Sequence, residues 1–358
     1  MKFLRPFAVV LAAAISIFSF SACAAKGSVL TFAAFNTVVR IETHGTVVSA
    51  TTKNQLENLF SDLHTTFDKN QNGSFIYNFN NSLSPNQPIA INNDAVALLK
   101  AAVFCYDLTN GKFDPTVYPL TKLWGFSPYL YSPNFSLPEQ SLIDQAKSAC
   151  DFSKINFSEQ DKTISKSQAQ IQMDLGGIAK GYAADKAAKI LLDAGHTAGY
   201  VSVGGSSLYL LKSQSLGLIH PRKEQNIITC NTENMPNLSL STSGDYERYH
   251  LDKDGKRYSH IIDPDSGYPA DTGVMSATVL GIEGAISDGL TTALCLASFT
   301  KNDNECELIS LINRIENEFP TAAIYVIYQD QTEKLVITNQ TQNLHFTLHD
   351  NEFSVYNV

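Results

Sequence analysis

A glycine-rich turn leads into a predicted helix at Met173–Gly181, where the sequence reads MDLGGIAKG. Two adjacent glycines let the backbone approach a ligand closely, and the free N–H groups of a helix start attract anions such as phosphate. Lys180 adds a positive charge in the first turn, where it opposes the helix dipole. The motif therefore predicts an anion site; the alternative is a simple turn beside a solvated lysine.

Asp288 and Thr292 are four residues apart in the segment SDGLTTAL, so they share one face of a helix. Carboxylate and hydroxyl oxygens are hard ligands that suit Mg²⁺ or Ca²⁺. Phosphoanhydride cleavage needs such a cation to neutralise the charge that develops. The pair predicts a divalent-cation site. The alternative is structural: Asp288 caps the helix start and Thr292 bonds back to the helix.

His260 stands at a predicted strand end, before a loop rich in Pro and Gly (HIIDPDSGYP). An imidazole that titrates near neutrality can accept a hydroxyl proton, so His260 is a candidate base. The alternative is that His260 and Asp263 only satisfy the loop backbone. A fourth segment, Lys112–Phe126, carries aromatic side chains that either flank a planar ring or pack in the core.

Taken together and in this order, these segments resemble the FAD:protein FMN transferases, also called ApbE-like flavin transferases. The resemblance spans about Phe32–Val358. The matching segments are FNTVVRI, SFIYNFN, NGKFDPTVYPLTKLWGF, MDLGGIAKGYAADK, VSVGGSS, STSGDYERY, HIIDPDSGYP and SDGLTTAL. The resemblance implies an α+β fold, with mixed and antiparallel sheets, packed helices and two lobes around an FAD cleft.

The resemblance also implies roles for individual residues. Mg²⁺ would be held by the Gly177 carbonyl, Asp288 and Thr292, and His260 would activate the acceptor hydroxyl, with Asp288 and His260 as the catalytic pair. The implied FAD contacts are Phe35, Phe113, Asp114, Asp174, Lys180 and the backbone at Ile262. This chain departs from the family at Phe35, where Met is frequent, and at Asn70–Gly73, where an aromatic residue is common.

The implied activity moves FMN from the substrate FAD to a Thr or Ser hydroxyl of an acceptor flavoprotein or redox-complex subunit. A phosphoester forms and AMP is released. Two alternatives stay open: a Mg-dependent FAD pyrophosphatase, with water as the nucleophile, and a flavin-binding lipoprotein without turnover. The Asp288/Thr292 pair argues against the second, because binding alone does not need a phosphate-bridging cation.

The N-terminus has the order of a bacterial lipoprotein signal. Lys2 and Arg5 precede an apolar run, Phe7–Phe20, which is short for a membrane-spanning helix of ~20 residues. Phe20–Cys23 resembles a lipobox, although Phe20 replaces the usual aliphatic residue. We predict a signal peptide (1–22), lipidation at Cys23, a tether (23–31) and a flavin transferase domain (32–358), exported and anchored on the periplasmic side of a membrane. An ordinary cleaved signal and an uncleaved anchor helix are the alternatives.

The composition narrows the class of protein. With 358 residues and 44% hydrophobic content, the chain can bury a sizeable core. Its 26 Lys and Arg against 35 Asp and Glu give a net charge of -9, without a basic run, which argues against nucleic-acid binding. The five cysteines after Cys23 follow no zinc-site spacing.

Hydrophobic periodicity predicts the elements that position these residues. Helices are expected at 51–67, 93–108, 141–149, 178–194, 285–298 and 308–316. Strands are expected at 31–42, 155–173, 199–211, 216–228, 238–249, 258–262, 275–280 and 322–358, and loops at 70–87 and 112–126. A short strand should end at Met173. Because helices, strands and tight hairpins are intermixed, we predict an α+β fold.

Overall fold

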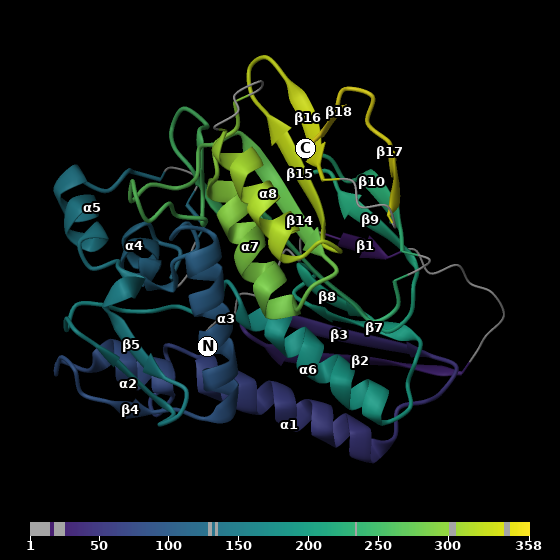
Figure 1. The fold of residues 1–358 in the computed structure, drawn as a ribbon, viewed down its shortest axis with the longest axis horizontal. Helices are drawn as coiled ribbons and strands as arrows, with labels where there is room; N and C mark the ends of the chain where they lie inside the picture. Colours follow the sequence, from purple (N-terminus) through teal and green to yellow (C-terminus); the bar gives the residue numbers. More distant parts are fainter. Residues whose placement is uncertain are drawn as a thin grey trace, which may run out of the picture.

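The computed structural model describes residues 15–17, 26–127, 131–132, 135–232, 235–300, 306–339 and 344–358. Within these ranges the dominant element is a nine-stranded sheet, in the order β18-β16-β15-β14-β11-β8-β7-β3-β2 (Figure 1). The pair β16–β18 is parallel, and the neighbouring pairs from β16 to β2 are antiparallel. The strands are β2 (Gly27–Ala34), β3 (Thr37–His44), β7 (Gly199–Val203), β8 (Ser207–Leu210), β11 (Leu238–Gly244), β14 (Val274–Leu280), β15 (Ala323–Gln329), β16 (Lys334–Thr338) and β18 (Ser354–Asn357).

Helices cover one face of this sheet (Figure 1). Strand β15 shows the two faces: Ile324 and Val326 join the helix-side core, whereas Tyr325 and Ile327 join a second core. The second core includes residues of β9 (Ser215–Ile219), β10 (Asn226–Asn231) and β17 (His345–Leu348), which form a small sheet together with β1 (Ile15–Ile17). The helices are α1 (Ala50–Phe67), α3 (Asn93–Leu108), α6 (Ala179–Asp193), α7 (Gly284–Leu296) and α8 (Glu307–Glu318).

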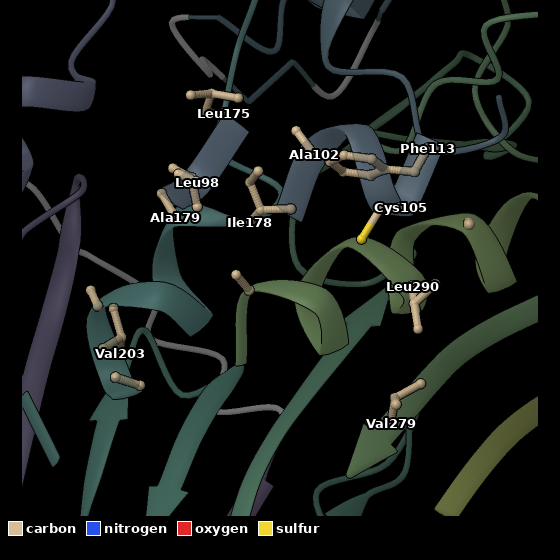
Figure 2. Packing of buried hydrophobic residues seen from close by; sticks show 14 of the residues in the cluster. Leu98, Ala102, Cys105, Phe113, Leu175, Ile178, Ala179, Val203, Val279 and Leu290 are labelled. Atoms are coloured by element: carbon tan, nitrogen blue, oxygen red, sulfur yellow. The ribbon is translucent and has the colours of Figure 1, made fainter. Parts of the chain in front are cut away.

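The helix-side core holds in place the helices that carry the predicted site residues. Side chains of α3, of the start of α6 and of α7 fill the space above the sheet, including Leu98, Cys105, Ile178 and Leu290 (Figure 2). Capping residues fix where helices begin: Ser49 accepts a hydrogen bond from the Thr52 N–H at α1, and Asn92 does the same for Ala95 at α3.

Smaller elements surround this frame. A third hydrophobic cluster joins α4 (Tyr118–Leu123) and α5 (Gln140–Lys147) to the segment around Tyr258 and Ile262, and it includes the fully buried Trp124. The remaining elements are α2 (Phe75–Asn81), β4 (Ile89–Ala90), η1 (Pro115–Val117), α4 (Tyr118–Leu123), α5 (Gln140–Lys147), η2 (Phe152–Lys154), β5 (Ile155–Ser158), β6 (Thr163–Lys166), β12 (Tyr249–Leu251) and β13 (Arg257–Ser259).

The predicted α+β class is confirmed, but several elements differ from the prediction. The expected strand at 31–42 is a hairpin, because Phe35 and Asn36 turn the chain with φ angles of 53° and 56°. The expected loop at 70–87 contains α2, whose start Ser74 caps, and the loop at 112–126 contains η1 and α4. The strand expected to end at Met173 is absent from residues 167–178, all of which are described.

Two predictions remain untested by the fold. The division into two lobes around a cleft stays a prediction. Cys23 and all of the predicted signal peptide except Ile15–Ile17 lie outside the described residues. Ile15–Ile17 pairs antiparallel with β9. In the described part of the chain, none of the helices has the length and apolar character needed to cross a membrane.

Candidate functional site

One cavity of about 250 Å³ collects the ten predicted site residues that the structure describes. They come from five separate stretches of the chain, so the fold brings together motifs that are far apart in sequence. The ten are Phe35, Phe113, Asp114, Asp174, Gly177, Lys180, His260, Ile262, Asp288 and Thr292. Their proximity is a property of the structure, whereas their individual roles remain predictions.

The glycine turn meets the Asp288 segment where α6 crosses α7. A Cβ atom on Gly181 would lie 1.9 Å from the Gly284 carbonyl oxygen, so only glycine permits this approach. The Gly181 N–H donates a hydrogen bond of 3.1 Å to Asp288 Oδ2. The start of α6 therefore lies directly against the predicted cation ligand.

Asp288 is buried on α7, with only 2% of its side chain exposed. Its Oδ1 lies 3.5 Å from Lys180 Nζ and accepts a hydrogen bond of 3.1 Å from Ser207 Oγ. Glu283, not Asp288, is the capping residue of α7, so the capping alternative for Asp288 is wrong. Thr292 Oγ1 does reach back to the Asp288 carbonyl, at 3.4 Å.

Gly177 places its backbone beside Thr292. A Cβ atom on Gly177 would lie 3.8 Å from Thr292 Oγ1 and 3.2 Å from the Phe113 ring. In the described residues there is no cluster of three or more His, Cys, Asp or Glu side chains that could hold a metal. The available donors are a carboxylate, a hydroxyl and a carbonyl, which fit Mg²⁺ because Mg²⁺ retains waters and substrate phosphate oxygens as its other ligands.

His260 is held in one tautomer by the backbone. Its Nδ1 lies 3.2 Å from the Arg248 carbonyl oxygen, which can only accept a hydrogen bond. Nδ1 therefore carries the proton, and Nε2 carries the lone pair. Burial, together with the charges of Arg248 and Lys180, lowers the pKa of His260 to about 3, so the ring is neutral at physiological pH.

The two predicted carboxylate contacts to FAD differ in their surroundings. Asp174 Oδ2 pairs with Lys69 Nζ at 2.8 Å, and its Oδ1 accepts a hydrogen bond from the Gly176 N–H. Asp114 caps η1 by accepting a hydrogen bond of 2.6 Å from the Thr116 N–H, and burial raises the pKa of its carboxyl group. Asp114 thus fixes the backbone of η1 at the cavity wall, whereas Asp174 lies at the cavity as part of an ion pair with Lys69.

The aromatic residues divide between wall and core. Phe35, Phe113 and Phe126 line the cavity. Trp124 is fully buried and packs in the third cluster, so the core alternative holds for it. Its Nε1–H donates a hydrogen bond of 2.8 Å to the Gly267 carbonyl, which ties this cluster to the loop that follows Ile262.

Asn80 clamps the chain that leads into the glycine turn. Its Nδ2 donates to the Met173 carbonyl at 2.9 Å, and its Oδ1 accepts from the Met173 N–H at 2.7 Å. Asn80→Ala leaves two buried backbone groups unpaired, so we expect a loss of about 3 kcal/mol in the free energy of unfolding. FAD binding should also weaken, because Asp174 follows Met173 directly. Urea unfolding and FAD titration measure both effects.

Asn81→Ala is the matched control, since Asn81 lies on the same helix but is exposed and bonds only within α2. Equal stability and equal FAD affinity of the two variants would contradict the role of Asn80.

Asp185 joins α6 to the start of α7. Its carboxylate accepts hydrogen bonds from the Gly284 N–H at 2.7 Å and from Ser239 Oγ. Burial raises the pKa of this carboxyl group to about 6, compared with ~3.9 in an unfolded chain. The folded state binds this proton more tightly, so the contribution of Asp185 to stability is greatest below about pH 4 and falls as the pH rises through 6.

We expect the ionisation of Asp185 to lower the free energy of unfolding of the wild-type protein by about 3 kcal/mol between about pH 4 and 7. Asp185→Asn should not show this pH-dependent loss of stability, since an amide does not titrate. Denaturant unfolding across this pH range measures the difference between the two proteins. Parallel pH profiles for wild type and variant would show that Asp185 does not have a raised pKa.

Several cavity residues were missed by the sequence interpretation. Glu247 and Arg248 lie within the STSGDYERY segment, so their place in a matching motif was a usable signal. Lys69 precedes the divergent loop Asn70–Gly73, and nothing in the sequence links it to Asp174. The missed lining residues include His64, Lys69, Thr242, Ser243, Glu247 and Arg248.

The fold and the cavity define a class of protein: an α+β protein with a glycine-rich helix start, a buried carboxylate and an aromatic wall in one site. This is the class predicted from the motifs. The chain belongs to the ApbE family, whose sequence model matches residues 35–310.

Individual relatives agree with this assignment. The FAD:protein FMN transferase of Haemophilus influenzae is 29% identical over 293 residues, covering 77% of this chain and 82% of that protein. The protein of the same name from Treponema pallidum is 30% identical, covering 70% of each chain. The solved ApbE protein of Thermotoga maritima matches with a TM-score of 0.71 and 27% identity, over 85% of this chain and 94% of that chain.

Proposed function

We propose that this chain is an FAD:protein FMN transferase, which moves FMN from FAD to a Thr or Ser hydroxyl of an acceptor flavoprotein or redox-complex subunit. The observation that carries the proposal is the contact between the start of α6 and Asp288 at one end of an aromatic-walled cavity. The names of the curated relatives in the same family support it.

The residues of the chain would act mainly by positioning and by charge. The diphosphate of FAD would lie at the start of α6, where the Lys180 ammonium and the positive end of the helix dipole attract anions. The Gly177 carbonyl, Asp288 and Thr292 would hold Mg²⁺. When bound, Mg²⁺ neutralises the charge that develops on the phosphate oxygens.

The reaction exchanges one phosphorus–oxygen bond for another. The acceptor oxygen bonds to the phosphorus on the FMN side, the bond from this phosphorus to the AMP oxygen breaks, and AMP leaves with the electron pair. The hydroxyl proton must pass to a base in the cavity. The family resemblance makes His260 the candidate.

The test mixes the protein with FAD, Mg²⁺ and a candidate acceptor domain, followed by denaturing electrophoresis. Flavin fluorescence on the acceptor, together with an equal amount of AMP, is the expected result. AMP without a labelled acceptor would favour the pyrophosphatase alternative. FAD that remains intact throughout would favour a flavin carrier without turnover.

We also propose export and lipid anchoring through Cys23, supported by the basic, apolar and small-residue order of residues 1–23. Cys23→Ser should shift nearly all of the protein from the membrane fraction to the soluble exported fraction, because acylation requires the thiol. Labelling with a radioactive fatty acid checks the modification directly. An unchanged distribution would contradict the anchor.

A further inference from the structure

His64 is a cavity residue to which neither the sequence motifs nor the proposed function assigns a role. It lies in the last turn of α1 with 35% of its side chain exposed, and it lines the cavity together with Phe35 and Asn36. These two residues form the tip of the hairpin between β2 and β3. His64 therefore lies where α1 meets the hairpin tip at the cavity wall.

The backbone of the hairpin tip is strained. Phe35 and Asn36 have φ angles of 53° and 56°, in the left-handed region. Asn tolerates this conformation, but a bulky residue such as Phe rarely adopts it, and the conformation persists only where surrounding contacts enforce it. The strand pairing ends at Ala34 and Thr37, so the Phe35 N–H lies outside the ladder and needs a partner of its own.

His64 contacts Phe35 twice. The Phe35 N–H donates a hydrogen bond of 3.3 Å to His64 Nδ1. The two rings also meet edge to face, with centroids 6.2 Å apart and an interplanar angle of 83°. One imidazole therefore holds both the backbone and the ring of a residue in the cavity wall.

The hydrogen bond from Phe35 defines the tautomer of His64. A backbone N–H only donates, so Nδ1 must offer its lone pair and the proton lies on Nε2. Asp68 Oδ2 lies 3.7 Å from Nε2, and its negative charge favours a proton on that nitrogen rather than on Nδ1. Asp68 thus supports the form of His64 that can accept the Phe35 N–H.

We propose that His64 is a positioning residue, which holds Phe35 at the place in the cavity wall where Phe35 contacts the flavin ring of FAD. This inference rests on the proposed transferase function. No bond to His64 forms or breaks in the reaction. Because His64 acts through Phe35, it should strengthen the binding of FAD and leave the binding of ADP, which has a diphosphate but no flavin, nearly unchanged.

His64→Leu tests this role, because leucine is also a branched side chain but cannot accept a hydrogen bond. The Phe35 N–H loses its partner and the hairpin tip is less ordered before FAD binds, so FAD affinity should fall by about tenfold. ADP affinity should change less than about twofold, because the start of α6 is unaltered. The KM for FAD should rise by about tenfold, with kcat within about threefold of wild type. Calorimetry with FAD and with ADP, without an acceptor, measures both affinities.

Two further variants supply the comparison. His64→Asn keeps an acceptor, because the Asn Oδ1 atom can take the place of His Nδ1, and its FAD affinity should stay within about threefold of wild type. His44→Leu is the matched control, since His44 lies on β3 of the same hairpin and its side chain, 42% exposed, pairs with Glu42. This control should bind FAD and ADP as the wild type does.

A double-mutant cycle shows whether His64 acts through Phe35. Phe35→Ala should itself weaken FAD binding. If His64 serves to hold Phe35, adding His64→Leu to Phe35→Ala should lower FAD affinity by less than about twofold more. A further loss of about tenfold in the double variant would show that the two residues act independently, and would overturn the inference.

Three other results would also overturn it. These are an unchanged FAD affinity in His64→Leu, equal losses of FAD and ADP affinity in that variant, and a failure of His64→Asn to restore FAD binding. A wild-type protein that does not bind FAD at all is a different result, because it refutes the transferase function itself.

Discussion

Asp288→Asn should lower the rate of FMN transfer by about 1,000-fold or more while the protein remains folded. The variant removes the charge of the proposed cation ligand. Metal stabilisation of phosphoryl transfer is worth several kcal/mol, and a 1,000-fold loss of rate corresponds to about 4 kcal/mol. The asparagine oxygen can still accept the hydrogen bond from Gly181 N–H, and its amide NH2 can donate to Ser207 Oγ, because a hydroxyl oxygen can also accept. The measurement is AMP release and acceptor labelling over a Mg²⁺ titration.

Asp193→Asn is the control for this experiment, because Asp193 is a carboxylate at the end of α6 with 65% of its side chain exposed. It should keep the wild-type rate and the wild-type Mg²⁺ dependence. If Asp288→Asn did the same, Asp288 would not be a metal ligand, and the metal-assisted reaction would need other donors.

Gly181→Ala should destabilise the protein by about 3 kcal/mol and also abolish transfer. Helix propensity alone predicts the opposite, a gain of about 1 kcal/mol, because Gly181 lies inside α6. The structure instead predicts a loss of stability. The new Cβ would lie 1.9 Å from the Gly284 carbonyl oxygen, so the two helices would have to separate. Separation would break the hydrogen bond between Gly181 N–H and Asp288.

Two further variants define this result. Gly284→Ala should act in the same direction, because its Cβ would lie 2.5 Å from the Gly181 carbonyl oxygen. Lys189→Ala is the control, because it changes a residue of α6 with 73% of its side chain exposed. Its free energy of unfolding should stay within about 0.5 kcal/mol of the wild-type value. Thermal and urea unfolding measure the free energy of unfolding of each variant. A stabilised Gly181→Ala would mean that α6 and α7 are not in contact at this point.

Local pattern predicted the main helices because their apolar faces and capping residues lie within a few positions of each other. Helix α3 occupies the predicted residues 93–108, with Asn92 as its cap. The hairpin turn at Phe35–Asn36 escaped prediction because its apolar, β-branched flanks run on without a glycine to mark the turn. Helix α2 escaped because it is short and rich in asparagine.

The site could be located from the sequence through the resemblance, but its supporting contacts could not. The pairing of Lys69 with Asp174 and the clamp from Asn80 to Met173 join residues about a hundred positions apart, and no local pattern records them. The raised pKa of Glu247 and the lowered pKa of His260 escape local pattern too, because burial and neighbouring charges set both pKa values.

The glycine contact between α6 and α7 has a consequence for the kinetics of ligand capture. Backbone touches backbone at Gly181 and Gly284, and the Gly181 N–H donates a hydrogen bond to the Asp288 carboxylate at the same point. The two helix segments that we propose bind the diphosphate are therefore already in contact before any dinucleotide arrives. Capture of FAD should then proceed in one phase at a rate proportional to its concentration, without a slow closing step between these helices.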